Sequence, residues 1–126
     1  MRIGELARLS GRSVHTIRWY EAQHLMPGAA RDAAGRRVFS QAHVDWLELM
    51  ARLRSSGMSI RQMQAYARQV REGKSTLAAR RQLLLEHRQR VQAQVADLNA
   101  SLALLDRKVA LYGGWIRKHG SGQDPS

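Results

Sequence analysis

The sequence predicts a mainly α-helical protein in which a small head of short helices, with one β-hairpin, is followed by a single long helix. Three observations support this fold class. Apolar residues recur at helical spacing in short segments between residues 3 and 73, and serine or glycine bounds these segments. Residues 29–40 have no helical period and carry β-prone side chains after Gly35. From residue 75 to 112 there is neither proline nor glycine, and apolar residues recur every seven positions.

The composition of the chain favours some partners and excludes some chemistry. Its 126 residues include 21 Lys and Arg against 10 Asp and Glu, a net charge of +11, which favours nucleic acid or an anionic membrane surface as partner. The chain has no cysteine, which excludes disulfides, thiolate metal sites and redox-active thiols. The N-terminus lacks the apolar core of a signal peptide, and no apolar run approaches the ~20 residues of a membrane span. We therefore expect a soluble, cytoplasmic protein without a membrane-spanning segment, and of the two anionic partners we expect nucleic acid and not a membrane.

Two short helices are predicted at the start of the chain, over residues 3–9 and from residue 14 onward. A glycine-containing turn joins them, and Ser13 is a good N-cap for the second. Leu25 is expected to continue the apolar face of the second helix until Pro27 stops it. Two short helices joined in this way form a helix-turn-helix, whose second helix enters the major groove of DNA.

The second helix carries polar and aromatic side chains that suit contact with DNA. Arg18 can donate two hydrogen bonds to guanine, and Thr16 can offer a hydroxyl group or meet a thymine methyl group. His15 can donate to a phosphate or to guanine N7. For Trp19 and Tyr20 two interpretations stay open, packing in the core and contact with phosphate. The DNA-binding residues predicted on this helix are Ser13, His15, Thr16, Arg18, Trp19 and Tyr20.

A small hairpin with Gly35 at its turn is predicted after this helix. It carries Arg31, Arg36 and Arg37, opposed only by Asp32. Such a cluster can follow the DNA backbone or enter the minor groove beside the recognition helix. We therefore add the three arginines to the predicted DNA-binding residues.

Two linking helices are predicted to complete the head. Ser40 can cap the first, which should end at Ser-Ser-Gly, residues 55–57. Ser59 begins a capping box for the second, and Gly73 should close it. The predicted DNA-binding domain with its linking helices therefore spans residues 1–73.

The helix predicted over residues 75–112 carries a heptad seam in its second half. Arginines interrupt the seam in the first half, so we expect that half to touch the head and the second half to pair with another chain. A helical hairpin within one chain, the alternative, lacks a matching partner helix. Gly113 and Gly114 should end the helix and leave 113–126 as a short, largely disordered tail. The predicted dimerisation residues are Val91, Val95, Leu98, Leu102, Leu105, Val109 and Tyr112.

Three motifs follow one another along the chain: IGELARLSGRSVHTIRWYE, R…AGRRVFS and LRSSGMSI. In combination they resemble the MerR family of bacterial transcription regulators, and the resemblance runs from Ile3 to about Tyr112. It implies a winged helix-turn-helix head, two linking helices, and a long helix that pairs in an antiparallel coiled coil with that of a second subunit.

Individual residues match the family's Arg-Tyr-Tyr-Glu run in the recognition helix and its Gly-Tyr-Arg-x-Tyr run in the wing. Trp19 replaces the first tyrosine of the helix run. In the wing, Arg36 stands where tyrosine is usual, and Phe39 lacks the hydroxyl group of the last tyrosine. Arg36 can restore by charge a phosphate contact that the tyrosines would make. The matching residues are Arg18, Tyr20, Glu21, Gly35, Arg37 and Phe39.

The resemblance implies a homodimer that binds a palindromic promoter operator in double-stranded DNA. Such a regulator distorts the operator so that RNA polymerase can engage, and it therefore acts on the polymerase indirectly. The alternative is an architectural or recombination-accessory DNA-binding protein with the same head. An enzyme is not expected, because no carboxylate pair, nucleophile-base set or phosphate loop is present.

The sequence excludes some of the signals that such a regulator could sense. The long helix is most similar to the branch of the family that senses aldehydes or nitrosative stress through a cysteine, and Arg52 stands at that position. The signal therefore does not pass through a thiol. The five histidines show no metal-ligand spacing, so neither a metal nor another cofactor is expected. A small-molecule effector, if there is one, should bind between the long helix and a head, where the candidate residues are Arg52, Tyr66, Tyr112 and Trp115.

Overall fold

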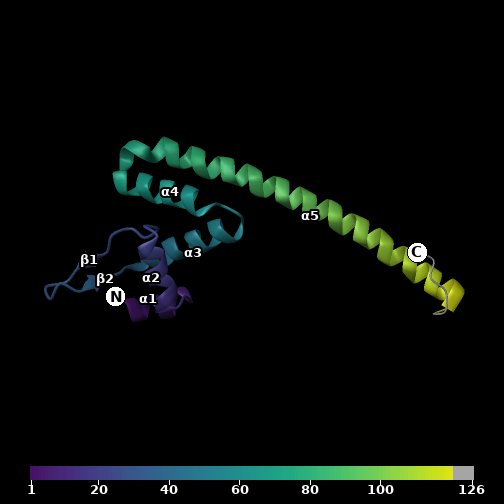
Figure 1. Ribbon diagram of the computed structural model, residues 1–126, viewed down its shortest axis with the longest axis horizontal. Helices are drawn as coiled ribbons and strands as arrows, with labels where there is room; N and C mark the ends of the chain where they lie inside the picture. Colours follow the sequence, from purple (N-terminus) through teal and green to yellow (C-terminus); the bar gives the residue numbers. More distant parts are fainter. Residues whose placement is uncertain (121–126) are drawn as a thin grey trace. The chain divides into compact units, whose positions relative to one another are not determined.

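The computed structural model describes residues 1–120. Its contacts divide the chain into two compact units, with the division after His87. Figure 1 shows the first four helices and the hairpin gathered in the first unit. The predicted fold class, mainly helical with one small hairpin and a long C-terminal helix, is confirmed. The elements in chain order are α1 (Ile3–Ser10), α2 (Val14–Ala22), β1 (Ala30–Arg31), β2 (Arg37–Val38), α3 (Gln41–Ser55), α4 (Ile60–Glu72), the short 3₁₀ helix η1 (Lys74–Thr76) and α5 (Leu77–His119).

The first unit is built around one apolar core. Leu6 of α1, Ile17 of α2 and Leu47 of α3 have no exposed surface. Removal of such apolar surface from water stabilises a fold by about 25 cal/mol per Å². Because this core holds one side of α2, the opposite side of the same helix faces outward. The other buried members are Tyr20, Leu25, Met26, Phe39, Met50, Leu53, Met58, Met63 and Tyr66.

Helix α2 ends earlier than the sequence predicts. Leu25 was expected inside it, but α2 ends at Ala22, and His24 adopts the left-handed conformation with a φ of 59°. The N–H of Leu25 donates to the carbonyl of Tyr20 (2.9 Å), and that of His24 donates to the carbonyl of Glu21 (3.0 Å). These two bonds form a Schellman motif, in which a histidine takes the position usually held by glycine. Leu25 still contributes to the core, from the loop beyond the helix.

The predicted hairpin is confirmed. Strands β1 and β2 are antiparallel, with Ala30 opposite Val38. Gly35 lies in the turn with a φ of 78°, a left-handed value that glycine adopts without strain. Asp32 Oδ1 accepts hydrogen bonds from two N–H groups of the turn, one of them that of Arg36 (2.9 Å), and these bonds lower the pKa of the Asp32 carboxyl. The turn therefore has a defined shape that presents its arginines.

Ser40 and Ser59 are the N-cap residues of the two linking helices, as predicted. At the start of α3 the capping contact is the reciprocal one, in which the N–H of Ser40 donates to His43 Nδ1 (3.1 Å). At the start of α4, Ser59 Oγ accepts from the N–H of Gln62 (3.1 Å). Gly73 closes α4 with a φ of 90°. These helix ends could be predicted because each depends on residues adjacent in sequence.

The first turns of α5 belong to the same compact unit as the head. Leu83 and Leu84 are half-buried against its core. His87 is buried, and its Nε2 lies 2.8 Å from Ser56 Oγ in the turn between α3 and α4. The compact unit that contains the head therefore ends at His87, and the expected contact between the head and the first half of the long helix is present in these turns.

The prediction that Gly113 and Gly114 end the long helix is wrong, because α5 continues through both to His119. Glycine inside a helix costs about 1 kcal/mol relative to alanine, which the hydrogen bonds of a long helix can offset. The rings of Tyr112 and Trp115 also pack edge to face across this segment, with centroids 5.3 Å apart. Residues 121–126 of the predicted tail lie outside the described residues.

A Gly114→Ala substitution is expected to stabilise α5. A Cβ at this position would meet only the Nη2 of Arg117, at 4.0 Å, so the methyl group fits without rearrangement. We expect the free energy of unfolding to rise by roughly 0.4–1 kcal/mol, because alanine restricts the unfolded chain more than glycine does. Denaturant unfolding followed by circular dichroism measures the change. The reciprocal control, Ala110→Gly on the same helix, should lower stability, and an equal fall for both variants would contradict an unstrained helix at residue 114.

Candidate nucleic-acid interface

The N-terminal end of α2 presents the predicted base-reading residues. Ser13 caps the helix, since its Oγ accepts from the N–H of Thr16 (3.0 Å) and donates to Thr16 Oγ1 (2.9 Å). Thr16 is half-buried, whereas His15 and Arg18 are exposed one helical turn apart on the outer face. Within residues 1–120, no ion pair engages Arg18. Its five donors are therefore available to a base edge or a phosphate.

Trp19 and Tyr20 link the recognition helix to the rest of the head. Tyr20 is 4% exposed, so its ring is a core residue. Trp19 is half-buried, meets the Tyr20 ring edge to face at 5.3 Å, and lies under the guanidinium group of Arg54 from α3, 4.4 Å from the ring centre. Both rings therefore fix the position of α2, and any contact of theirs with phosphate stays a prediction.

The hairpin of β1 and β2 is the wing of this head, and its three arginines, Arg31, Arg36 and Arg37, have different partners. Arg37 donates to the carboxylate of Glu21 on α2, and its guanidinium carbon lies 5.7 Å from the centre of the Phe39 ring. This pair connects the wing to the recognition helix. Arg36 forms an exposed ion pair with Asp32 (3.2 Å), and Arg31 donates to the carbonyl of Gly35 (2.7 Å). Exposed ion pairs contribute little to stability, so the guanidinium group of Arg36 can turn toward a phosphate at small cost.

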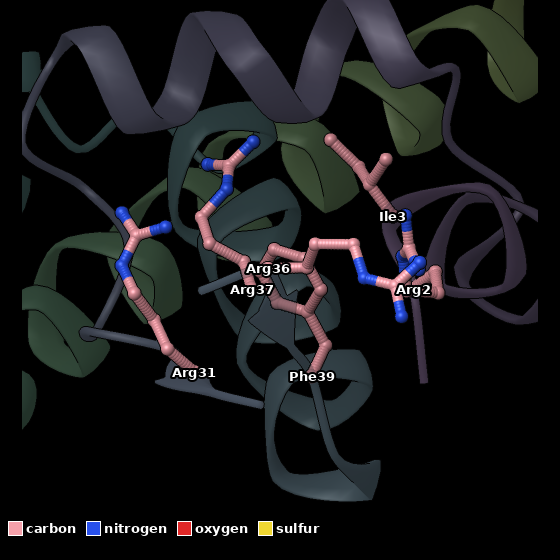
Figure 2. Close-up of a pocket in the computed structure, with 6 residues that line it drawn as sticks. All are labelled: Arg2, Ile3, Arg31, Arg36, Arg37 and Phe39. Atoms are coloured by element: carbon pink, nitrogen blue, oxygen red, sulfur yellow. The ribbon is translucent and has the colours of Figure 1, made fainter. Parts of the chain in front are cut away.

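Two clefts flank the hairpin. The first, of about 250 Å³, is lined by the three wing arginines together with Arg2, Ile3 and Phe39 (Figure 2). The second, of about 450 Å³, includes Glu21, His24 and Arg71, and Arg71 donates to the carbonyl of His24 (3.2 Å). Sequence reasoning missed Arg2 and Arg71, because contacts between distant parts of the chain bring each to the hairpin region.

The predicted dimerisation residues form an exposed apolar stripe along the second unit. Val95, Leu98, Leu102, Leu105 and Val109 are each more than half exposed, and Val109 is 71% exposed. Val91 is half-buried, and Tyr112 is 37% exposed. Ile116, seven residues after Val109, continues the stripe beyond the glycines and was missed because the helix was expected to end there. A stripe of this length exposed to water is typical of a helix that pairs with another.

The residues proposed for an effector have separate surroundings. Tyr66 is buried and stacks on Trp46, with ring centroids 5.6 Å apart, so it is a core residue of the head. Arg52 is exposed and forms an ion pair with Glu48 (2.9 Å). Tyr112 and Trp115 contact each other on α5. An effector role for these residues stays a prediction.

Some kinds of site are absent from the part of the chain that the structure describes. Within residues 1–120, no group of three or more His, Asp or Glu side chains lies close enough together to hold a metal ion. Over the same residues, no helix combines the length and the apolar character that crossing a membrane requires.

A helix-turn-helix with an outward polar face, flanked by an arginine-bearing hairpin, defines a winged-helix DNA-binding protein. The family model described as MerR HTH family regulatory protein matches residues 1–70. The chain belongs to the MerR family of transcription regulators. It is accordingly a regulator and not an enzyme.

Relatives and solved structures agree with this assignment. An uncharacterized HTH-type transcriptional regulator of Haemophilus influenzae is 33% identical over 102 residues, 81% of this chain and 76% of that protein. A MerR family regulator from Listeria monocytogenes superposes with a TM-score of 0.82 at 33% identity, over 90% of this chain and 86% of that one. A further solved structure is that of HiNmlR, a MerR family regulator lacking the sensor domain, bound to promoter DNA. It superposes with a TM-score of 0.80 at 31% identity, over 95% of this chain and 94% of that one.

Proposed function

We propose that the protein is a homodimeric regulator that binds a palindromic promoter operator in double-stranded DNA and controls transcription by distorting it. The observation that carries the proposal is the outward face of α2, where His15 and Arg18 are exposed on the same helix whose Glu21 pairs with Arg37 of the hairpin. Arginine side chains near the start of a recognition helix make the commonest specific base contact, to guanine O6 and N7. The similarity to HiNmlR, whose structure contains promoter DNA, supports this use of the head.

Dimerisation follows from the apolar stripe on α5. Burial of the stripe needs a second helix of the same length, and a second copy of α5 supplies one in an antiparallel coiled coil. A dimer carries two recognition helices and therefore matches an operator with two symmetric half-sites. The dimerisation residues that we propose include Val91 and Ile116 at the two ends of the stripe.

The dimer would act through the shape of its DNA. A protein that bends or untwists a promoter stores deformation energy in it, and two conformations of the dimer would hold the same operator differently. RNA polymerase would respond to this change indirectly, in the cytoplasm. The signal does not pass through a thiol, since the chain has no cysteine. Arg52, Tyr66, Tyr112 and Trp115 stay candidates for contact with a small effector.

A footprint on the DNA upstream of the protein's own gene and of neighbouring genes tests the function. We expect protection of a symmetric site, with enhanced cleavage at its centre where the DNA is distorted. Transcription from that promoter in vitro should change when the protein is added. Equal affinity for the operator and for random duplexes, with a steep salt dependence, would instead indicate an architectural DNA-binding protein.

An Arg18→Ala substitution should weaken binding chiefly at the specific site. Loss of a bidentate contact to guanine costs about 1–3 kcal/mol for each site, whereas loss of a phosphate contact weakens all sequences equally. The affinities for the operator and for a random duplex, measured at one salt concentration, separate the two cases.

The matched control for this experiment is Arg107→Ala, which removes the same charge from an exposed position on α5. It should leave the ratio of specific to random affinity unchanged. An Arg18→Ala protein with the wild-type ratio would contradict a base-reading role for Arg18.

A further inference from the structure

The start of the chain pairs with the end of the wing. The main-chain nitrogen of Met1 donates to the carbonyl of Phe39, and the N–H of Phe39 donates to the carbonyl of Met1, both at 2.6 Å. This exchange of two bonds is the pattern of an antiparallel strand pair. It holds the next residue, Arg2, beside the hairpin, although 34 residues lie between Arg2 and Arg37 in the sequence.

Arg2 lines the 250 Å³ cleft together with the three wing arginines and two apolar residues, Ile3 and Phe39 (Figure 2). The positive charge of Arg2 also contributes to the lowered pKa of Asp32 in the hairpin turn. Four guanidinium groups therefore surround a space smaller than the roughly 300–1,000 Å³ of most small-molecule sites.

The four arginines differ in the hydrogen bonds and ion pairs that their guanidinium groups already make. Arg37 is paired with Glu21, Arg36 with Asp32, and Arg31 donates to a carbonyl of the turn. Within residues 1–120 no carboxylate forms an ion pair with Arg2, whose side chain is exposed. An anion that entered the cleft would therefore meet at least one guanidinium group that breaks no existing ion pair.

We propose that this cleft binds a phosphate of the DNA backbone, and that Arg2 is its principal contact. A guanidinium group matches the geometry of a phosphate with two parallel hydrogen bonds. A phosphodiester at the cleft would fix how closely the wing approaches the DNA, because backbone contacts set register without reading sequence. The inference rests on the proposed function, which places the hairpin beside DNA.

The salt dependence of DNA binding tests this proposal. The affinities of the wild-type protein, Arg2→Gln, Arg2→Lys and Arg107→Gln are measured on an operator duplex and on a random duplex over 50–200 mM salt. Each phosphate contact adds about 0.9 to the slope of log affinity against log salt. Arg2→Gln should therefore lower the slope by about 0.9 for each bound head, on both duplexes. Over this fourfold range of salt, the affinity of Arg2→Gln should therefore fall by a factor roughly threefold smaller, for each bound head, than the affinity of the wild-type protein.

The controls separate a phosphate contact from other effects of the substitution. Arg2→Lys keeps the charge and should retain the wild-type slope, and Arg107→Gln should retain it as well. Circular dichroism shows whether Arg2→Gln folds. If it does not, the salt slopes of Arg2→Ala and Arg2→Lys are compared instead. Equal slopes for the neutral Arg2 variant and the wild-type protein would overturn the proposal.

Two further outcomes are distinguished by the same measurements. If the wild-type protein shows no preference for the operator, the proposed function fails, while the slopes on random duplex still decide whether the cleft binds a backbone phosphate. A calorimetric titration with inorganic phosphate tests whether the cleft binds free phosphate instead of a phosphate of the DNA backbone. Phosphate binding that Arg2→Gln abolishes, together with an unchanged DNA slope, would overturn the assignment to DNA.

Discussion

Replacement of both Leu98 and Leu105 by aspartate is expected to produce a monomer that no longer holds a symmetric operator. These side chains are 65% and 59% exposed in the single chain, so the substitutions leave the core of the head intact. In a paired coiled coil the same positions are buried, and an unpaired carboxylate there would carry a large desolvation cost. Since a second linked head raises affinity by about 10²–10⁴, operator binding should fall by a similar factor. Light scattering and operator affinity measure the two effects.

The matched control places two aspartates on the opposite side of the same helix. Ala93 and Ala100 are also exposed and also seven residues apart, but they lie away from the apolar stripe. Ala93→Asp with Ala100→Asp should therefore remain dimeric and bind the operator with an affinity close to that of the wild type. A dimeric Leu98→Asp, Leu105→Asp protein would refute pairing through the stripe, and a monomer with full operator affinity would refute binding by two linked heads.

The features that the sequence predicts correctly depend on residues close to one another in the chain. The capping bonds of Ser13 and Ser59 span three residues, and the turn at Gly35 needs a left-handed conformation that glycine supplies. The periodicity of α5 reports its helical state directly. Local signals of this kind identify the helix-turn-helix, the wing and the long helix.

The features that the sequence does not predict depend on a balance of energies or on long-range contacts. His24 ends α2 in a conformation that non-glycine residues seldom adopt, because the buried side chain of Leu25 must turn back onto the core. Gly113 and Gly114 would end a short helix, yet α5 continues through them. The position of Arg2 beside the wing depends on main-chain bonds to Phe39, and no pattern in the sequence indicates them.

A Leu47→Ala substitution is expected to give the largest loss of stability in the head. Leu47 has no exposed surface and belongs to the core that holds α1, α2 and α3 together. Removal of a buried leucine side chain costs about 2–5 kcal/mol, since transfer energy is lost and a cavity remains. Denaturant unfolding, followed by tryptophan fluorescence, should show a lower midpoint with an unchanged slope. The variants must be compared at equal protomer concentration, because dimerisation contributes to apparent stability.

The control is Leu9→Ala, the same chemical change on α1 at a side chain that is 43% exposed. It should alter stability by about 0.5 kcal/mol or less, as is usual for surface positions. Below its unfolding transition, Leu47→Ala should bind the operator like the wild-type protein, since Leu47 lies in the core rather than on the proposed DNA face. A loss no larger than that of Leu9→Ala would contradict the core described above. A stable Leu47→Ala head with weakened operator binding would show instead that this core sets the orientation of α2.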